Sequence, residues 1–298
     1  MRPHLEKSRG GAYSDPDGLP GRPLNLPYGD RMPSPFTAAS LQFPIEMGQV
    51  EANLSRALAL LREAAGTGAS LCVLPEMWST GFAYDNLLRL CGSTPEILHE
   101  LRRFAAERKI VLAGSLPERS GRSVYNTLYV IDATGIVAGE YRKAHLFTPS
   151  GEHLHFRRGA QARTVRTRVG VLGPQICYDI RFPELSRKYF LEGATLLCVS
   201  AQWPTARKEH WDLLIAARAV ENQLFVVATN AVGRSGEFQY SGGSAVLSPL
   251  GERLAQGGEE EAVVRATVDP GRIDEVRRRI PCAKDRNERA YRRTRPPR

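Results

Sequence analysis

Short apolar runs alternate with amphipathic stretches from residue 36 onward, and this alternation is what most constrains the fold of the chain. Apolar runs of strand length occupy residues 36–43, 71–74 and 110–115. Between the first two, Leu54, Leu58 and Leu61 recur with the i, i+4, i+7 spacing of one helix face. Strands alternating with helices predict a single domain of the α/β class.

Two hairpins are predicted within this alternation. Residues 124–131 and 136–142 are separated by the turn-forming sequence Asp132-Ala133-Thr134-Gly135. A second turn around 248–251 comes before a strand at 262–268. Because hairpins are mixed with strand–helix–strand crossovers, a purely parallel doubly wound sheet is excluded. The pattern suits two sheets packed face to face and covered by helices.

The remaining elements are read from local signals. Helices are predicted from Thr94, over 184–192 and in a long stretch ending at 222, with strands at 195–200 and 224–230. Thr94 has the residue type of an N-cap, and Pro95 suits the first helical position. Residues 173–175 (Gly-Pro-Gln) interrupt the apolar run that leads to Cys177. Since proline donates no ladder hydrogen bond and glycine favours bulges, we expect a kink there.

Composition bounds the class of protein. The chain has 298 residues, of which 42% are hydrophobic, so it can bury a large core. It contains no run approaching the ~20 apolar residues of a membrane span, and its amino end lacks the apolar core of a signal peptide. The five cysteines are odd in number and show no paired spacing. Reduced thiols in a cytoplasmic protein are therefore expected rather than a disulfide framework.

The net charge of +9 is concentrated at the carboxyl end. Residues 272–298 contain eleven Lys or Arg and four Asp or Glu. No stacking aromatics alternate with these arginines, so a solvated basic segment is favoured over a specific nucleic-acid interface. Residues 1–35 are rich in Gly, Pro and charge, which predicts a flexible extension. The expected organisation is an extension over 1–35, one domain over 36–291 and a basic tail over 292–298; Met32 is a candidate initiator.

Three reactive side chains follow predicted strands: Glu76, Lys143 and Cys177. Ligand sites in open α/β sheets form beyond the carboxyl ends of strands. Pro183 suits the start of a helix shortly after Cys177. The thiol is thus expected near free N–H groups and a positive helix pole, which favour thiolate and a developing oxyanion. A base, a cation and a nucleophile at strand ends predict an active site.

Three segments carry a family resemblance: residues 74–82 (LPEMWSTGF), 141–147 (YRKAHLF) and 176–184 (ICYDIRFPE). In this order they closely resemble the three signatures of the nitrilase superfamily, the carbon–nitrogen hydrolases. The likeness runs from about Phe36 to Tyr291. Residues 200–204 (SAQWP), 210–211 (HW) and 217–223 (ARAVENQ) resemble the ω-amidase branch. The resemblance implies a four-layer αββα sandwich, usually paired into dimers through outer helices.

Amide hydrolysis assigns a role to each of these residues. A free thiol is only a few per cent ionised at neutral pH, so a nearby cation, Lys143, would favour the thiolate. Glu76 would take the thiol proton and deliver it to departing ammonia. The backbone N–H of Tyr178 and the Lys143 ammonium would bind the oxyanion. A thioester would form on Cys177 and be hydrolysed by water, with no cofactor, and the resemblance implies these same roles.

A second glutamate is implied by the resemblance at Glu152, where it would position substrate and lysine. His153 and His155 beside it could suggest a metal. Without a third ligand at a recognisable spacing, we predict no metal site. Cys72 and Cys198 lie in apolar strands and are expected in the core.

Arg181, Arg207 and Trp203 are candidate substrate contacts. A guanidinium matches a carboxylate bidentately, and Trp203 could wall the pocket. The ω-amidase resemblance implies a small dicarboxylic monoamide, such as a 2-oxo acid ω-amide, hydrolysed to acid and ammonia. Two alternatives stay open: hydrolysis of N-carbamoyl amides or nitriles on the same residues, and a non-catalytic binding protein with the same fold. No membrane partner is expected.

Overall fold

The structure is a computed structural model that describes residues 34–291. Nearly all of the predicted extension over 1–35, including Met32, and the basic tail over 292–298 lie outside the described residues. The division of the chain at these boundaries stays a prediction.

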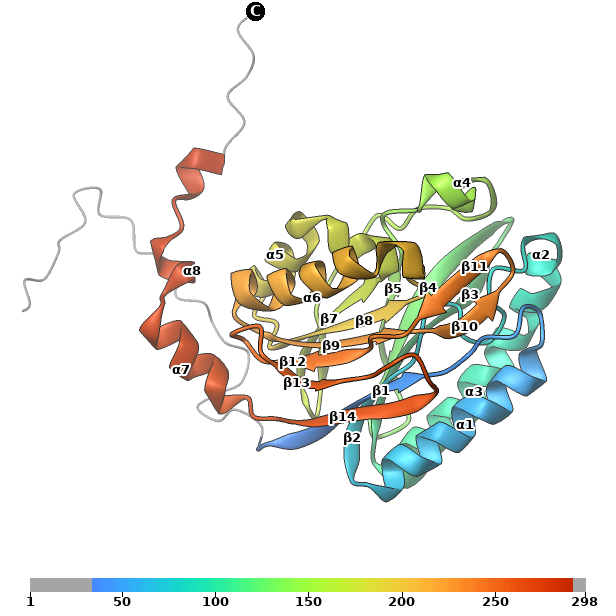
Figure 1. The fold of residues 1–298 in the computed structure, drawn as a ribbon, viewed down its shortest axis with the longest axis horizontal. Helices are drawn as coiled ribbons and strands as arrows, with labels where there is room; N and C mark the ends of the chain where they lie inside the picture. Colours follow the sequence, from blue (N-terminus) through green and yellow to red (C-terminus); the bar gives the residue numbers. More distant parts are fainter. Residues whose placement is uncertain (1–33, 292–298) are drawn as a thin grey trace, which may run out of the picture.

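Two six-stranded mixed sheets form the centre of the domain (Figure 1). In the first sheet the strand order is β14(Ala262–Val268), β1(Phe36–Gln42), β2(Ala69–Val73), β3(Val111–Ser120), β4(Ser123–Ile131) and β5(Val137–Arg142). In the second it is β13(Arg253–Gln256), β12(Ala245–Leu247), β9(Phe225–Asn230), β8(Leu196–Ala201), β7(Gly170–Ile176) and β6(Val165–Thr167). Strands β1, β2 and β3 run parallel, as do β7, β8 and β9, while antiparallel pairs complete each sheet.

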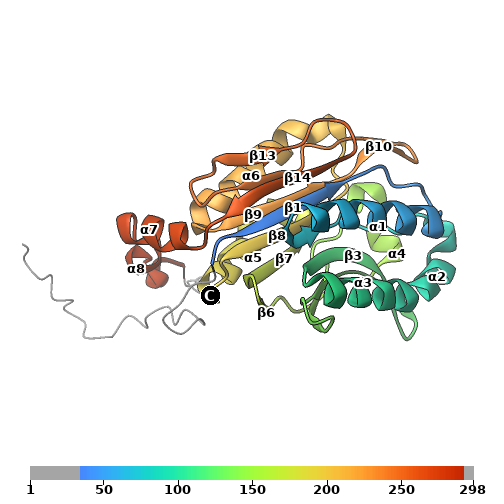
Figure 2. The ribbon, with the colours of Figure 1, turned by 90° about the horizontal axis from the view of Figure 1, so that it is seen from below.

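Helices cover the outer face of each sheet (Figure 1, Figure 2). The helices α1(Val50–Gly66) and α3(Thr94–Arg108) pack on the first sheet, where Leu61 and Phe104 join its outer core. The helices α5(Pro183–Leu191) and α6(Lys208–Asn222) cover the second sheet through Tyr189 and Ile215. The inner faces meet in one apolar cluster to which Leu71, Leu128 and other residues of both sheets contribute. The predicted four-layer αββα sandwich is therefore confirmed.

Shorter elements lie at the two ends of the molecule. The short helices α2(Leu87–Leu90) and α4(Glu152–His155) and the hairpin β10(Val232–Ser235)–β11(Phe238–Ser241) lie at one end (Figure 1). The helices α7(Gly271–Arg279) and α8(Cys282–Asp285) lie at the opposite end in both views (Figure 2). This β10–β11 hairpin and α4 were not predicted, because neither has a long apolar period.

The kink expected at residues 173–175 is wrong. β7 runs straight through Pro174, which pairs with Cys198 of β8 without a register shift. The edge strand β6 pairs only with residues 170–172 of β7, so no neighbour on that side needs an N–H from position 174. The Pro174 carbonyl accepts the Tyr189 hydroxyl at 2.8 Å. A proline is tolerated where one side of the strand is unpaired.

The N-cap expected at Thr94 is also wrong. The helix α3 already begins at Thr94, and no side chain caps its first turn. The Thr94 hydroxyl instead donates to the carbonyl oxygen of Pro117 at 2.6 Å, which fastens the helix to β3. The Thr94 side chain therefore makes a tertiary hydrogen bond to β3 in place of a local cap.

Candidate active site

Cys177 follows β7 directly and opens a 3₁₀ turn, residues 177–181. Its φ of 46° is left-handed, a conformation that costs a non-glycine residue about 1–3 kcal/mol and is seen most often at functional sites. The turn is held by Asp179, whose Oδ2 accepts the backbone N–H of Ile176 at 3.0 Å. The strained turn lifts the thiol off the end of the strand.

Glu76 lies three residues beyond the end of β2, on a loop whose next residue, Met77, also has a left-handed φ of 45°. The Met77 N–H donates to the Ser115 hydroxyl at 2.8 Å, which fixes this loop to β3. The Glu76 side chain is fully buried. Its Oε2 accepts the backbone N–H of Gln202 at 3.1 Å, and its own carbonyl accepts the Gln202 side-chain amide at 2.9 Å.

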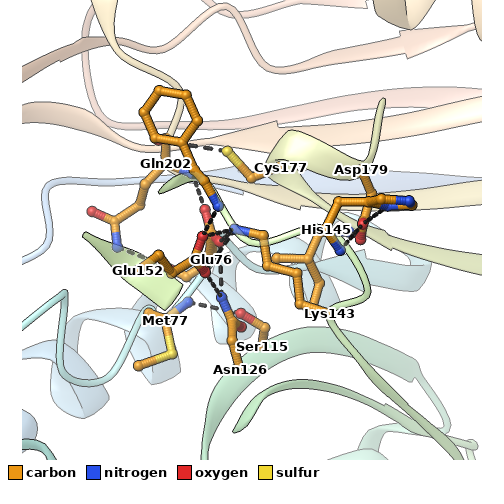
Figure 3. Close-up of polar contacts among 12 residues, drawn as sticks. Glu76, Met77, Ser115, Asn126, Lys143, His145, Glu152, Cys177, Asp179 and Gln202 are labelled. Atoms are coloured by element: carbon orange, nitrogen blue, oxygen red, sulfur yellow. Dashed lines mark hydrogen bonds and ion pairs between the residues drawn. The ribbon is translucent and has the colours of Figure 1, made fainter. Parts of the chain in front are cut away.

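Lys143 follows β5 directly and lies between two carboxylates (Figure 3). Its Nζ is 2.7 Å from Glu76 Oε1 and 2.9 Å from both carboxylate oxygens of Glu152. All three side chains are at most 2% exposed. Burial lowers the pKa of Lys143, but Glu152 and Glu76 outweigh burial and raise that pKa well above its usual value. The two carboxylates therefore favour the charged ammonium form of Lys143.

Glu152 is held at the first residue of α4. Besides Lys143, its Oε2 accepts the backbone N–H of Phe147 at 2.6 Å. This hydrogen bond connects the loop that follows Lys143 to the first residue of α4. Both carboxylates thus have donors on both oxygens, and Glu76 is the one that interacts with the thiol of Cys177.

The thiol of Cys177 is buried beside Glu76. Its Sγ lies 3.7 Å from the backbone carbonyl oxygen of Gln202. Burial, and then the Glu76 carboxylate, raise the pKa of Cys177 well above its usual value, and Lys143 opposes this only in part. The raised pKa of Cys177 favours the neutral thiol, so the reaction needs a base, such as the neighbouring Glu76, to remove its proton.

A second polar cluster fastens the Cys177 turn to the Lys143 loop. The buried Asp179 accepts the Tyr141 hydroxyl at 2.9 Å. It also accepts the His145 backbone N–H at 3.1 Å and His145 Nδ1–H at 2.7 Å (Figure 3). Tyr141 and His145 flank Lys143 on the first sheet, whereas Asp179 belongs to the turn after β7. The cluster therefore sets the separation of nucleophile and cation across the two sheets.

These groups open into one cavity of about 290 Å³. Every residue predicted for the site lines it: Glu76, Lys143, Glu152, Cys177, Tyr178, Arg181, Trp203 and Arg207. The cavity is close to the lower limit of small-molecule sites. Aromatic rings make much of its wall: Phe82, Tyr84, Phe147, Phe238 and Tyr240.

The two arginines lie near the mouth of the cavity and are half-buried. The Arg181 guanidinium lies over the Trp203 ring, 4.8 Å from its centroid, and 3.2 Å from His210 Nδ1. The Arg207 guanidinium lies over the Phe147 ring at 5.3 Å. Trp203 itself is buried, and its indole N–H donates to the Arg207 carbonyl at 2.8 Å. Cations held against aromatic faces keep their N–H groups available to an anion.

Sequence reasoning missed three polar residues of the site: Asn126, Asp179 and Gln202. Asn126 was recoverable, because it shares the face of β4 with Val124 and Leu128 and is the polar member of an otherwise apolar set. Asp179 and Gln202 stand within quoted motifs, but nothing in the sequence shows that they join distant loops.

The structure brings no metal site together at His153 and His155. His153 is exposed, and His155 stacks on Tyr84 with ring centroids 4.0 Å apart. Within residues 34–291 there is no group of three or more His, Cys, Asp or Glu side chains placed to hold a metal ion. The same residues contain no helix long and apolar enough to cross a membrane.

Comparison with known proteins identifies the class. A carbon–nitrogen hydrolase family model matches residues 37–278. The chain is 39% identical over 252 residues to a 2-oxoglutaramate amidase of Bacillus subtilis, covering 84% of this chain and 97% of that one. It is 34% identical over 271 residues to an omega-amidase of Danio rerio, covering 87% and 97%.

A solved structure is similar as well. It is a variant of an amidase from Nesterenkonia sp., which carries the acetamide moiety of fluoroacetamide covalently added at its active-site cysteine. The TM-score is 0.77 at 25% identity, over 86% of this chain and 95% of that one. The chain therefore belongs to the carbon–nitrogen hydrolase family, and it is a hydrolase of carbon–nitrogen bonds. The predicted membership of the nitrilase superfamily, in its ω-amidase-like branch, is confirmed.

Proposed function

We propose that this chain hydrolyses the ω-amide of a small dicarboxylic or 2-oxo acid to the free acid and ammonia. The observation that carries the proposal is a buried thiol, carboxylate and ammonium facing one cavity whose mouth holds two arginines. The amidases to which the chain is similar support the same substrate class.

The first half of the reaction acylates Cys177. Glu76 accepts the thiol proton as the sulfur attacks the amide carbonyl carbon, so that no thiolate has to persist in the buried site. The carbonyl oxygen becomes an oxyanion, bound by the Tyr178 backbone N–H and by one N–H of Lys143. The carbon–nitrogen bond then breaks, and Glu76 returns its proton to the nitrogen. Ammonia leaves, and a thioester to Cys177 remains.

The second half reverses the proton path. Glu76 takes a proton from water, the hydroxide attacks the thioester carbonyl and the same donors bind the second oxyanion. The carbon–sulfur bond breaks, the sulfur regains its proton from Glu76 and the acid leaves. The covalent adduct at the active-site cysteine of the similar Nesterenkonia amidase supports Cys177 as the nucleophile.

Glu152 acts through Lys143. Bound to both of its oxygens at 2.9 Å, the ammonium keeps its charge and its direction while one N–H turns to the oxyanion. Arg181 and Arg207 bind the distal carboxylate, and Trp203 forms the wall against the substrate chain. The half-buried guanidiniums suit a substrate that carries one charge remote from the scissile bond.

We also propose a dimeric protein of a reducing, cytoplasmic compartment. The outer helix α6 exposes Leu213 by 68% and Val220 by 51%, apolar area of the kind that oligomer interfaces cover. All five cysteines are free. Light scattering after gel filtration tests the dimer, which predicts twice the 33.0 kDa chain mass.

An ammonia-release screen tests the reaction. The panel holds ω-amides of dicarboxylic and 2-oxo acids, N-carbamoyl amino acids and nitriles, with the Cys177→Ala variant as blank. The proposal expects the highest kcat/KM on an ω-amide. Preferred release of carbon dioxide with ammonia would make the protein a carbamoylase, and turnover of nitriles alone a nitrilase. No turnover of any member would support a binding protein.

A further inference from the structure

Asn126 of β4 contacts both carboxylates of the site. Its Nδ2 lies 2.8 Å from Glu76 Oε1 and 3.5 Å from Glu152 Oε1 (Figure 3). The backbone carbonyl of Asn126 also accepts the backbone N–H of Lys143 at 2.9 Å. A side-chain amide has two N–H donors on one nitrogen, so a single Asn126 can serve both glutamates.

The orientation of this amide follows from its neighbours. Rotating the amide by half a turn would set its oxygen against two carboxylates, so Nδ2 is the atom that faces them. The Oδ1 atom is then left buried without a partner within the described residues. A buried acceptor without a donor is unfavourable. The hydrogen bonds of the Asn126 side chain are therefore made by its N–H groups alone.

Lys143 has no spare donor at rest. Its ammonium has three N–H groups, and its three contacts are all with carboxylate oxygens. When one N–H turns to the oxyanion, a carboxylate loses a donor. Asn126 already contacts the Oε1 atom of Glu76 that Lys143 would release.

We propose that Asn126 is a positioning residue for hydrolysis, whose amide keeps Glu76 ionised and directed at Cys177 while Lys143 serves the oxyanion. This inference rests on the proposed amidase function. It adds a neutral donor to the set of charged groups that the reaction needs.

The electrostatics around Glu76 are consistent with this role. The groups that face it are Lys143, Glu152, Cys177, Tyr84 and Tyr240. Burial and Glu152 raise the pKa of Glu76 and Lys143 lowers it, and the net shift is upward, so each donor to the carboxylate helps to keep it ionised. A hydrogen bond to the ionised carboxylate favours that form and lowers the pKa. Removing the Asn126 donor must therefore raise the pKa of Glu76 further.

The pH profile of Asn126→Leu tests the proposal. Glu76 works as a base only when deprotonated, so the acidic limb of kcat/KM moves to higher pH by about one unit. At a pH below the acidic limb kcat falls by about tenfold, and the loss diminishes as the pH rises above the limb, while KM is little changed. Asn126→Asp keeps the shape but adds a third carboxylate, and its acidic limb moves further in the same direction.

Asn222→Leu is the matched control. Asn222 is also fully buried, also has an unpartnered Oδ1 and lies in α6 away from the cavity. This variant loses thermal stability without any shift of the acidic limb. If Asn126→Leu does the same, the residue is merely structural and the proposal is wrong. Should that variant not fold, Asn126→Ser is measured in the same way.

Alkylation of Cys177 by iodoacetamide separates this proposal from the proposed function. Its rate, followed against pH by mass mapping of the Cys177 peptide, depends on the base and not on the substrate. A shifted alkylation profile without ω-amide turnover keeps Asn126 as positioning residue and rejects the amidase. Turnover with unshifted profiles rejects only the role of Asn126.

Discussion

The floor of the cavity and its mouth hold cations in opposite ways. At the floor, Lys143 is fully buried between Glu76 and Glu152. At the mouth, Arg181 and Arg207 are half-buried against aromatic rings, and neither has a carboxylate partner within residues 34–291. This difference indicates that the charged groups at the floor are held in place by one another, as bond breaking requires. At the mouth, the two guanidinium groups remain available to bind the anionic group of a substrate.

Removing the nucleophile should have the largest effect on the floor. Cys177→Ser is expected to lose essentially all turnover on every amide, because a buried hydroxyl is a far weaker nucleophile than a thiol. Circular dichroism should show an unchanged fold. The matched control is Cys72→Ser, which should keep turnover. The Cys72 thiol lies in the apolar core, where burial raises its pKa to about 12. Turnover by the Cys177 variant at the native rate would refute the mechanism.

Removing the base should have the next largest effect. Glu76→Gln keeps the shape of the side chain and can no longer accept the thiol proton, so kcat should fall by ~10²–10⁴. The loss should be equal for charged and neutral amides, since the floor does not contact the distal end of the substrate. Steady-state kinetics checks this, with the exposed Glu184→Gln as control. A loss confined to charged amides would assign Glu76 to recognition.

Variants of the mouth should separate binding from chemistry. Arg181→Met and Arg207→Met each remove a charge-assisted contact to the distal carboxylate. We expect KM to rise by about 10–100-fold at similar kcat, the equivalent of roughly 1.5–3 kcal/mol. A neutral amide of similar size is the matched substrate and should show no change. Equal losses on both substrates would erase the distinction between floor and mouth.

Weakening the Asp179 cluster that joins the two sheets should have the smallest effect on turnover. His145→Asn removes the imidazole contact to Asp179 and leaves the Tyr141 and backbone contacts in place. One such hydrogen bond is worth about 1 kcal/mol, so kcat should fall only several-fold with a small drop in melting temperature. A loss as large as that of Glu76→Gln would move His145 into the chemistry itself.

The family resemblance predicted the four-layer fold, and the residues that the sequence proposed for the site all line one cavity. Lys143 and Cys177 stand directly after strands, but these strands belong to different sheets, so the strand pattern alone could not predict that the two residues meet at one cavity. The motifs around Glu76, Lys143 and Cys177 placed these residues in one family. The period of the chain alone indicated only an α/β domain.

What escaped the sequence depends on contacts between distant segments. The raised pKa of the Cys177 thiol results from burial and from Glu76, and neither cause is visible from residues 169–185. The straight passage of β7 through Pro174 depends on the shortness of β6. The hydroxyl of Thr94 meets Pro117 only after α3 has docked. In each case a tertiary partner overrode a sound local rule.

The site is shared between two layers of the sandwich. Glu76 and Lys143 come from loops of the first sheet, and Cys177 comes from the second. Neither half can be productive by itself, so turnover reports on whether the sheets have met face to face. During refolding, recovery of ammonia release should consequently lag behind the formation of either sheet and coincide with the final closing of the interior.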